Sequence, residues 1–524
     1  MSQIFSKIRV GNSRRSTFDL SHNQVTSADF GQLIPICYRD MLPNDDFIVT
    51  PSAFVRLAPC AVPFYGQIKV RLHHFFVPYR ILYDAWDAFI SQSPSNFTVP
   101  PYFTVGAINQ VLDEDPQFNP SASPSVVRGT YCKLMSNLGL NPEVFNSVIG
   151  DSTRISAFPF LAYYRIWLDY YMDSNLNDHS QLDLAFKNLV HDGGDLDSVV
   201  LDFLQYRNCC YKKDYFTTAK TSPQEGSPSK TPVTIADNVA NPGLNAGNDN
   251  ASYSISHLNG PTANKVYNSV TGAANNATNV IGEFEVEALR GAVSAQRYSE
   301  RNNYVGSKII NRILAHFGIS PSAERLDMAE YLGGESFPIA VQDVTSHNSV
   351  SDLNDNYTTM GLGLQAGKGL GNNRNPQTVH YHAKEHGIFM TLMSIIPDTA
   401  YYQGISKFWT KGVTGEALDY FTPEFANLGY QEILNRELYC PDRKSVIDDD
   451  YQSYDPKGVF WYTPRYSEYK FSYDVLGSDF VGPFKTATGN PEVAGSYMDS
   501  WHLFRKLYYT ELNPYKNQPL QDYQ

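Results

Sequence analysis

The chain has 524 residues and a net charge of −13, with 42% hydrophobic and only 18% charged residues. This length permits a sizeable core, and the negative charge argues against a chain that binds nucleic acid over its whole surface. Aromatic residues make up 14%, with 36 Tyr and 30 Phe, which suits large hydrogen-bonded contact surfaces. No obvious linker divides the chain, so we expect one large domain with insertions.

The N-terminal residues 1–35 are polar and irregular, and we expect them to form an arm outside the domain. Four basic residues precede the first acidic one, Asp19; they are Lys7, Arg9, Arg14 and Arg15. Such an arm could contact phosphates weakly and without sequence preference. The alternative is a solvated tail with no binding role.

Two long strands are predicted early in the chain. From Gln67 to Val77 the residues alternate, with Ile68, Val70 and Leu72 on one side and Lys69, Arg71 and His73 on the other. A second strand is predicted from Phe47 to Leu57, with Pro51 marking a bulge or a sheet edge. Together they predict a large antiparallel sandwich, with the rest of the chain forming long insertions between its strands.

Helices are predicted at 81–90, at Phe158–Met172 and within 285–317. An aromatic stripe on the second predicts a core or subunit contact rather than a ligand site. The third should break near Asn302, Asn303 and Gly306 and end with Gly318 as its C-cap. Residues 91–150 show little periodicity and are expected to form a long connection, which we expect at subunit contacts together with 398–440.

Residues 218–280 form the most polar stretch, with eleven Asn and only six charged residues. Such a segment cannot bury much area of its own. Three copies could instead bury its apolar residues against one another; these are Ile235, Leu244, Tyr253, Ile255, Leu258 and Tyr267. The alternative is a surface loop without a role.

The C-terminal half is expected to contain a loop over residues 340–378, a long strand at His380–Pro397, short helices and turns over 398–450, and a strand at Trp461–Asp474. The glycine run within the loop is not a Walker phosphate loop, because Lys368 is followed by Gly369 rather than Ser or Thr. The aromatic tail from Trp501 is expected to be docked.

Catalytic, metal and membrane sites are not indicated. His380, His382 and His386 resemble a zinc cluster, but a polar strand face at a subunit contact is the favoured interpretation. An acidic run at 448–450 could bind calcium, although a solvated loop is favoured. No nucleophile motif occurs, so we expect neither an enzyme nor a cofactor. Six cysteines without a CxxC pair predict reduced thiols, and the longest apolar run is too short to span a bilayer.

Several blocks resemble one family. These are STFDLSHNQVTS (16–27), HHFFVPYRILYDAW (73–86), FPFLAYYRIWLDYYMDSNL (158–176), KKDYFTTA (212–219), EALRGAVSAQRYSERN (287–302), HFGISPSAERLDMAEYLGGES (316–336), EHGIFMTLMSIIPDTAYYQGISKFW (385–409) and DSWHL (499–503). In this order they resemble the major capsid protein of gokushovirus-type microviruses, small icosahedral single-stranded DNA bacteriophages. Thr17 departs from the pattern, which has Arg there.

The resemblance implies a mainly β fold, an eight-stranded antiparallel jelly roll of the viral capsid type, over residues 36–524 with long, partly helical inter-strand insertions. It implies sixty copies in a T=1 shell, built through pentamers around a circular single-stranded DNA genome, with residues 1–35 inside. It also implies an internal scaffolding protein, a DNA pilot protein and a small basic DNA-packaging protein as partners. The variable 218–280 insertion would protrude at the threefold axis and meet a host-cell receptor.

The implied location is the virion, with assembly in the bacterial host cytoplasm. Two other classes remain open from the residues alone. A carbohydrate-binding or carbohydrate-active β-sandwich would account for the aromatic and acidic content and would need paired carboxylates across a cleft. A virion spike or scaffolding protein is the other.

Overall fold

The structure is a computed structural model. It describes residues 16–58, 67–91, 99–114, 130–140, 150–173, 179–191, 193–210, 212–226, 286–306, 308–322, 327–345, 365–373, 375–401, 404–413, 419–423, 429–438 and 457–475, together with five short strands between residues 234 and 283.

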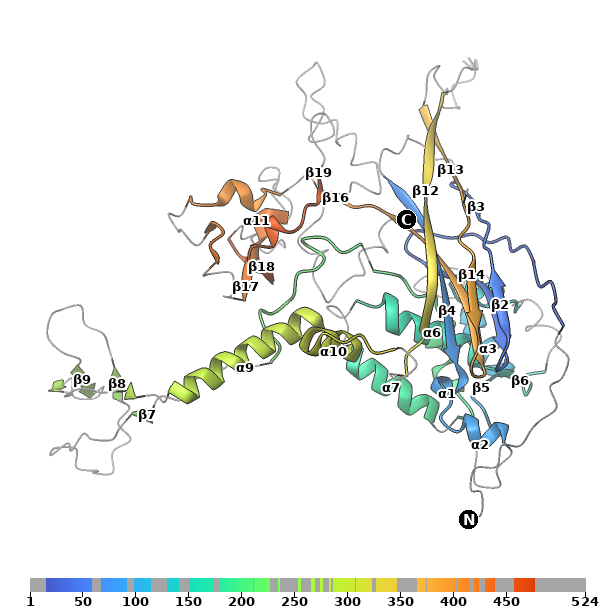
Figure 1. Ribbon diagram of the computed structural model, residues 1–524, viewed down its shortest axis with the longest axis horizontal. Coiled ribbons are helices and arrows are strands. Elements are labelled where there is room, and N and C mark those ends of the chain that lie inside the picture. Colours follow the sequence, from blue (N-terminus) through green and yellow to red (C-terminus); the bar gives the residue numbers. More distant parts are fainter. Residues whose placement is uncertain are drawn as a thin grey trace, which may run out of the picture.

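A six-stranded antiparallel sheet lies at the centre, in the order β1-β15-β4-β12-β13-β3 (Figure 1). In that order the strands are Leu33–Met41, Gly387–Pro397, Ile68–Pro78, Glu330–Thr345, Gln365–Asn372 and Phe54–Arg56. The central strand β4 pairs with β15 over its whole length and with β12 from Ile68 to Phe76. Strands from both halves of the chain therefore complete one sheet.

The alternation predicted for β4 is confirmed in its first half. Ile68, Val70 and Leu72 are buried, whereas the alternate residues Lys69, Arg71 and His73 are half-buried. From His74 onward both faces of the strand are buried. The change occurs because helices cover one face of the sheet and a second, short ladder covers the other.

Two strands that were predicted as continuous are each divided in the structure, and one half of each forms this ladder. The stretch 47–57 divides at Pro51 into β2 (Asp46–Val49) and β3, which pair with β14 and β13 respectively. The stretch 380–397 divides into β14 (Val379–His382) and β15. Proline lacks the N–H that a continuous strand needs, and the resulting β2–β14 ladder packs its aromatic rings on the sheet, with Phe47 6.1 Å from Phe389.

The loop predicted for 340–378 is wrong in part, because it contains the end of β12 and all of β13. The glycines of β13 mask its strand character. At Gly369 an added Cβ would lie 2.4 Å from Leu57 Cδ1, so only glycine allows the segment after β3 to approach this closely.

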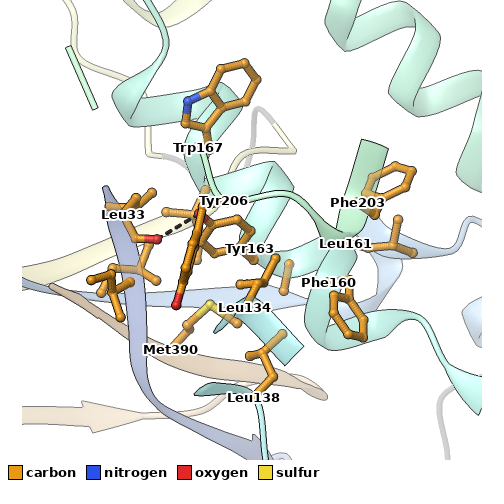
Figure 2. Close-up of a cluster of buried hydrophobic side chains, with 14 of the residues drawn as sticks. Leu33, Leu134, Leu138, Phe160, Leu161, Tyr163, Trp167, Phe203, Tyr206 and Met390 are labelled. Carbon is orange, nitrogen blue, oxygen red and sulfur yellow. Dashed lines mark hydrogen bonds between the residues drawn. The ribbon is translucent and has the colours of Figure 1, made fainter. Parts of the chain in front are cut away.

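Helices cover one face of the sheet. The predicted aromatic helix is observed as α6 (Phe158–Ile166), continued by a π-helical turn η1 (Trp167–Tyr171). Its Tyr163 is fully enclosed and donates a hydrogen bond to the Leu33 carbonyl of β1 at 2.8 Å (Figure 2). The helix predicted at 81–90 is two short ones. The other helices here are α1 (Tyr79–Leu82), α2 (Trp86–Ile90), α3 (Val105–Glu114), α4 (Thr130–Asn137), α7 (His179–His191) and α8 (Val200–Leu204).

The connection predicted for 91–150 therefore contains regular structure. Phe103, Val105, Ile108 and Leu112, on β5 (Tyr102–Thr104) and α3, are all fully buried in the main core. The hydrophobic periodicity of 91–150 is weak because its two helices, α3 and α4, are short and are flanked by proline and asparagine. β5 pairs with β6 (Arg154–Ser156) beneath this layer.

A second, smaller core lies around β17 (Tyr430–Leu434) and β18 (Val459–Pro464). It buries Tyr215, Phe216, Tyr401 and Ile433. β18 is shorter than the predicted strand 461–474 and is followed by a 3-10 turn at Ser467–Tyr469. As expected, the described part of 398–450 contains short elements; these are β16 (Ala400–Tyr401), η4 (Lys407–Thr410) and α11 (Asn435–Leu438), with β17 between the last two. β16 pairs with β19 (Asp474–Val475).

Two further helices lead away from the body. α9 (Val286–Val305) and α10 (Ile309–Phe317) match the predicted pair, and the break falls at Gly306, one of the three residues predicted for it, while Asn302 and Asn303 lie within α9. Gly318 ends α10 in the left-handed conformation at φ 71°, as predicted. The architecture is thus mixed: a curled six-stranded antiparallel sheet with helical insertions.

Candidate assembly and nucleic-acid surfaces

The N-terminal segment 16–29 is extended and almost wholly exposed. Its attachment is polar, since Thr26 donates to Asn137 at 2.8 Å and His22 lies 3.3 Å from the Arg39 guanidinium. Between this segment, β2, β3 and the sheet lies a groove of about 2490 Å³. The basic residues Lys7, Arg9, Arg14 and Arg15 lie outside the described residues.

The floor of the groove is one face of β15. Phe389, Thr391, Met393 and Ile395 alternate along the strand and line the groove together. Arg39 and Arg56 also line it, together with five acidic residues, Asp19, Asp29, Asp40, Asp45 and Asp46. The groove is thus apolar along β15 and carries more acidic than basic side chains elsewhere.

Four of the six predicted protrusion residues are among the described residues, and all four lie on short strands. Ile235 belongs to β7 (Thr234–Ile235), Tyr253 and Ile255 to β8 (Tyr253–Ile255), and Tyr267 to β9 (Lys265–Asn268). β8 pairs with β9, where Ser254 opposes Tyr267, and β9 pairs with β10 (Ala274–Asn276). β7 pairs with β11 (Gly282–Glu283). Leu244 and Leu258 lie outside the described residues.

These small sheets lie at the end of α9 that is far from the main sheet (Figure 1). One chain thus forms hydrogen-bonded ladders within this segment, without help from symmetry-related copies. The structure brings together the backbones of Tyr253, Ile255 and Tyr267 in one three-stranded sheet, and it places Ile235 in another.

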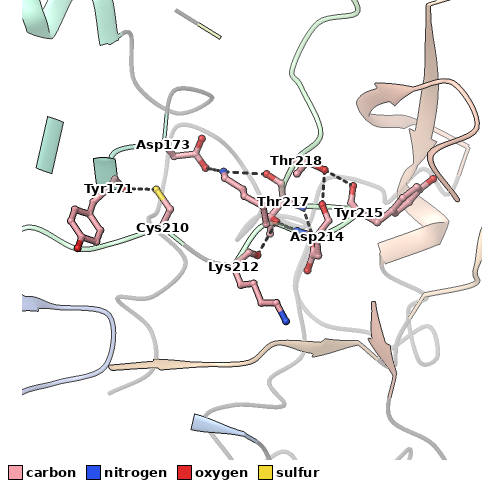
Figure 3. A network of polar contacts seen from close by, with 9 residues as sticks. Tyr171, Asp173, Cys210, Lys212, Asp214, Tyr215, Thr217 and Thr218 are labelled. Carbon is pink, nitrogen blue, oxygen red and sulfur yellow. Dashed lines mark hydrogen bonds and ion pairs between the residues drawn. The ribbon is translucent and has the colours of Figure 1, made fainter. Parts of the chain in front are cut away.

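The KKDYFTTA motif joins the two cores (Figure 3). The Asp214 carboxylate accepts from the Phe216 and Thr217 amides at 2.9 and 2.8 Å and from the Tyr401 hydroxyl at 2.8 Å. Lys213 forms an ion pair with Asp173 at 2.6 Å, at the end of the aromatic helix. The motif therefore acts as a rigid turn, which explains its residues without invoking a ligand.

A buried charge cluster was not predicted from the sequence. Arg165 is 2% exposed and pairs with Asp169 at 2.9 Å and with Asp183 at 2.5 Å. Burial opposes the charge of Arg165, but the two carboxylates outweigh it and raise the pKa of the guanidinium. Lys308 donates to the Asp169 carbonyl, and burial lowers the pKa of this lysine. The i,i+4 spacing of Arg165 and Asp169 inside an aromatic helix was the available signal.

The histidines of β14 form no metal site. His382 lies 2.6 Å from Asp46 across the ladder, and His386 contacts the Trp86 ring edge. Within the described ranges no group of three His, Cys, Asp or Glu side chains could hold a metal ion. The acidic run 448–450 lies outside those ranges. Among the described helices none combines the length and hydropathy that crossing a bilayer requires.

Exposed apolar side chains occur on many elements, and two sets of them lie close together in the sequence. The first, which we call the α10 stripe, consists of the exposed Ile309, Leu314 and Phe317 with the half-buried Ile310 and Ile313. The second, the aromatic knob, consists of Phe408 and Trp409 on η4, which are 71% and 74% exposed. Monomeric proteins rarely leave such groups uncovered, so both surfaces indicate contacts with another molecule.

Comparison with known proteins identifies the family of the chain. A family model described as "Capsid protein (F protein)" matches residues 6–514. Capsid protein VP1 of Chlamydia phage 1 is 26% identical over 575 aligned positions, covering 96% of this chain and 89% of the relative. VP1 of Bdellovibrio phage phiMH2K is 24% identical over 95% of this chain and 86% of the relative, and VP1 of Spiroplasma virus 4 is 24% identical over 83% and 78%. The chain therefore belongs to the microvirus capsid protein (F protein) family, as a structural component of the virion rather than an enzyme.

Proposed function

We propose that this chain is the major capsid protein of a T=1 shell, in which sixty copies assemble through pentamers around a circular single-stranded DNA genome. The family match over residues 6–514 carries the proposal. The eight-stranded capsid jelly roll over residues 36–524 is likewise proposed from the family; the six-stranded antiparallel sheet with the β2–β14 ladder packed on it is compatible with that fold.

The N-terminal arm, residues 1–35, lies inside the shell in this proposal, with Lys7, Arg9, Arg14 and Arg15 on the genome. The four basic residues that precede the first acidic residue of the chain, and the exposure of the segment 16–29 that follows them, support this placement. Because the chain carries a net charge of −13, the shell alone cannot neutralise the DNA. A small basic DNA-packaging protein is therefore proposed as a partner. An internal scaffolding protein and a DNA pilot protein are proposed as partners from the family alone.

The insertion 218–280 is proposed as the outward protrusion at the threefold axis that contacts a host-cell receptor. Its polar composition and the position of its described strands β7 to β10 at the far end of α9 support this role (Figure 1). Assembly takes place in the host cytoplasm.

Electron microscopy and light scattering of the purified chain test the assembly. Sixty copies of a 58.9 kDa chain should give particles of about 3.5 MDa with icosahedral symmetry. A small soluble oligomer that binds a glycan column would contradict the proposal and favour a carbohydrate-binding sandwich.

A further inference from the structure

The groove between the segment 16–29, β2, β3 and the sheet gathers exposed apolar side chains around one volume. Six large apolar residues that line it are each more than half exposed; these are Phe18, Leu20, Val25, Leu42, Ile48 and Phe54. They come from separate stretches of the chain that surround about 2490 Å³. The groove thus offers apolar surface from several sides at once, as a binding site for an extended segment does.

The carboxylates of the groove are only partly neutralised. Asp19, Asp40 and Asp45 accept hydrogen bonds at 2.8 to 3.0 Å from two backbone amides and a tyrosine hydroxyl, all uncharged donors. None of the three forms an ion pair with a described residue. The other two aspartates, Asp29 and Asp46, lie beside a lysine and a histidine. An occupant of the groove is therefore stabilised if it brings cations as well as apolar side chains.

The arginines that line the groove do not supply those cations. Arg39 lies 3.3 Å from the His22 ring nitrogen, and Arg56 lies over the Phe54 ring at 5.2 Å. With five aspartates against two arginines, the lining carries an excess of negative charge. This excess disfavours a nucleic acid as the occupant, because phosphates would be repelled.

The first fifteen residues of the chain have the required composition. They contain four basic residues, no acidic residue and four large apolar ones, Ile4, Phe5, Ile8 and Val10. Basic and apolar residues alternate from position 7 to position 10. In an extended conformation such a stretch has one basic side and one apolar side, which matches a groove with both acidic and apolar lining.

The covalent link favours this segment over a separate molecule. Residue 15 is joined to Ser16, which itself lines the groove, and fifteen extended residues reach about 50 Å. A segment on a short tether meets its site at an effective concentration in the millimolar range. The chain's own N-terminus therefore has an advantage over the same segment of another copy.

We infer that residues 1–15 occupy this groove in the unassembled chain, with their basic side chains beside Asp19, Asp40 and Asp45. The same basic side chains are those proposed above to contact the genome. The groove thus covers them until DNA competes for them, which makes it an autoinhibitory site for DNA binding. Release by DNA rests on the proposed genome contact, whereas occupation of the groove does not.

Cross-linking of the unassembled, DNA-free chain tests the occupation. Cys37 is a free cysteine that lines the groove, so Ile8→Cys treated with a short bismaleimide should give a link between positions 8 and 37 within one chain. Peptide mass spectrometry identifies the link, and Ile8→Cys combined with Cys37→Ser should abolish it. Absence of the 8–37 link from the folded chain would overturn the inference. Covalent dimers joined through these positions would overturn the assignment to the chain's own N-terminus.

Charge substitutions test the role of the aspartates. Asp19→Asn with Asp45→Asn keeps the shape and an acceptor oxygen at each position but removes two negative charges, so the yield of the link should fall about fivefold. The matched control, Arg56→Gln, removes a positive charge from the same lining and should not lower the yield. Equal yields in the two variants would overturn the contact between the basic side chains and the groove.

Addition of oligothymidylate before the cross-linker tests the release. The yield of the 8–37 link should fall severalfold, because phosphates bind the same basic side chains. An unchanged yield would overturn the release and with it the proposed genome contact of the arm, while the link itself would still show the groove occupied. Failure of the groove contact and failure of the genome contact can therefore be told apart.

Discussion

Two adjacent histidines of β4 show how burial changes the chemistry of single residues. His74 is 1% exposed, lies 2.9 Å from the Thr391 hydroxyl and stacks on Phe389. Burial, with a smaller contribution from His73, lowers the pKa of His74 to about 4. Burial and then Arg71 lower the pKa of His73 to about 4 as well. Both imidazoles are therefore neutral in the folded protein near pH 7.

This predicts acid sensitivity. In the unfolded chain these histidines have a pKa near 6.5 and bind protons that the folded chain does not, so folded stability is complete above about pH 6.5 and is lost as the pH falls towards 4. For buried His74 the loss approaches roughly 3 kcal/mol. Thermal unfolding of the unassembled chain between pH 7 and pH 4.5 should show a falling midpoint. His74→Gln should flatten this slope; an unchanged slope in that variant would assign the acid sensitivity elsewhere.

The arm residues predict a separation of packaging from assembly. Changing Lys7, Arg9, Arg14 and Arg15 to Ala should lower the DNA content of particles more than it lowers their yield, because the lost contacts are to phosphates. The absorbance ratio of purified particles at 260 and 280 nm measures this. Lys187→Ala, half-exposed on α7, is the control. Normal DNA content in the fourfold variant would remove the arm from the genome contact.

At the scale of elements, periodic segments could be predicted and segments governed by partners could not. The alternation in β4, the aromatic helix α6 and the Gly318 cap all follow local rules and were confirmed. β13 was not predicted because it is rich in glycine, which has a low strand propensity. The glycine at 369 is needed for close packing against Leu57, and this contact cannot be recognised from the local sequence. The split at Pro51 was visible in the sequence, but the different partners of β2 and β3 were not.

The buried charge cluster ties α6, η1 and α7 together, and its disruption should be costly. Arg165→Ala leaves Asp169 buried without its cation and should lower the free energy of unfolding by about 3–5 kcal/mol. Lys187→Ala breaks the exposed pair that shares Asp183 and should cost at most about 1 kcal/mol. Urea unfolding of both variants gives the comparison. A loss for Arg165→Ala as small as that of the control would mean that the cluster adds little stability.

The insertion predicts a separation of assembly from attachment. Deleting the chain between Lys220 and Val280 removes β7 to β10 but spares the described part of the sheet. Such shells should assemble and fail to adsorb to host cells, as measured by depletion of particles from the supernatant. Normal adsorption would exclude the attachment role, whereas absence of shells would make the segment structural.

At the scale of the whole molecule, charge and contact surface act in opposite directions. Each chain carries −13, so copies repel, while the α10 stripe and the aromatic knob offer apolar contacts that salt does not screen. Assembly of empty shells should therefore be faster at about 0.5 M than at about 0.05 M NaCl. Light scattering measures the rate. Slower assembly at the higher salt concentration would show that ion pairs, rather than apolar contacts, hold the shell.

The family could be identified from ordered sequence blocks, and the comparisons confirmed it. The pairing of β4 with β12 and β15 could not be predicted, because no local rule selects a strand hundreds of residues away. The exposure of the α10 stripe and of the aromatic knob could not be predicted for a related reason. The spacing in α10 predicted a helix, but the contacts of its Arg312 and His316 with Glu225 and with α9 could not be predicted from that spacing.

The order of the strands along the chain also determines how long β4 waits for its partner strands during synthesis. β4 ends at Pro78, and its first partner, β12, begins 252 residues later, at Glu330. At about 5–20 residues per second, a ribosome needs roughly 10–50 s to make that interval. During this time an apolar strand with two open edges emerges without either neighbour, a state prone to aggregation. The edges of β4 are thus open to pairing with other chains during synthesis, before the native sheet can form.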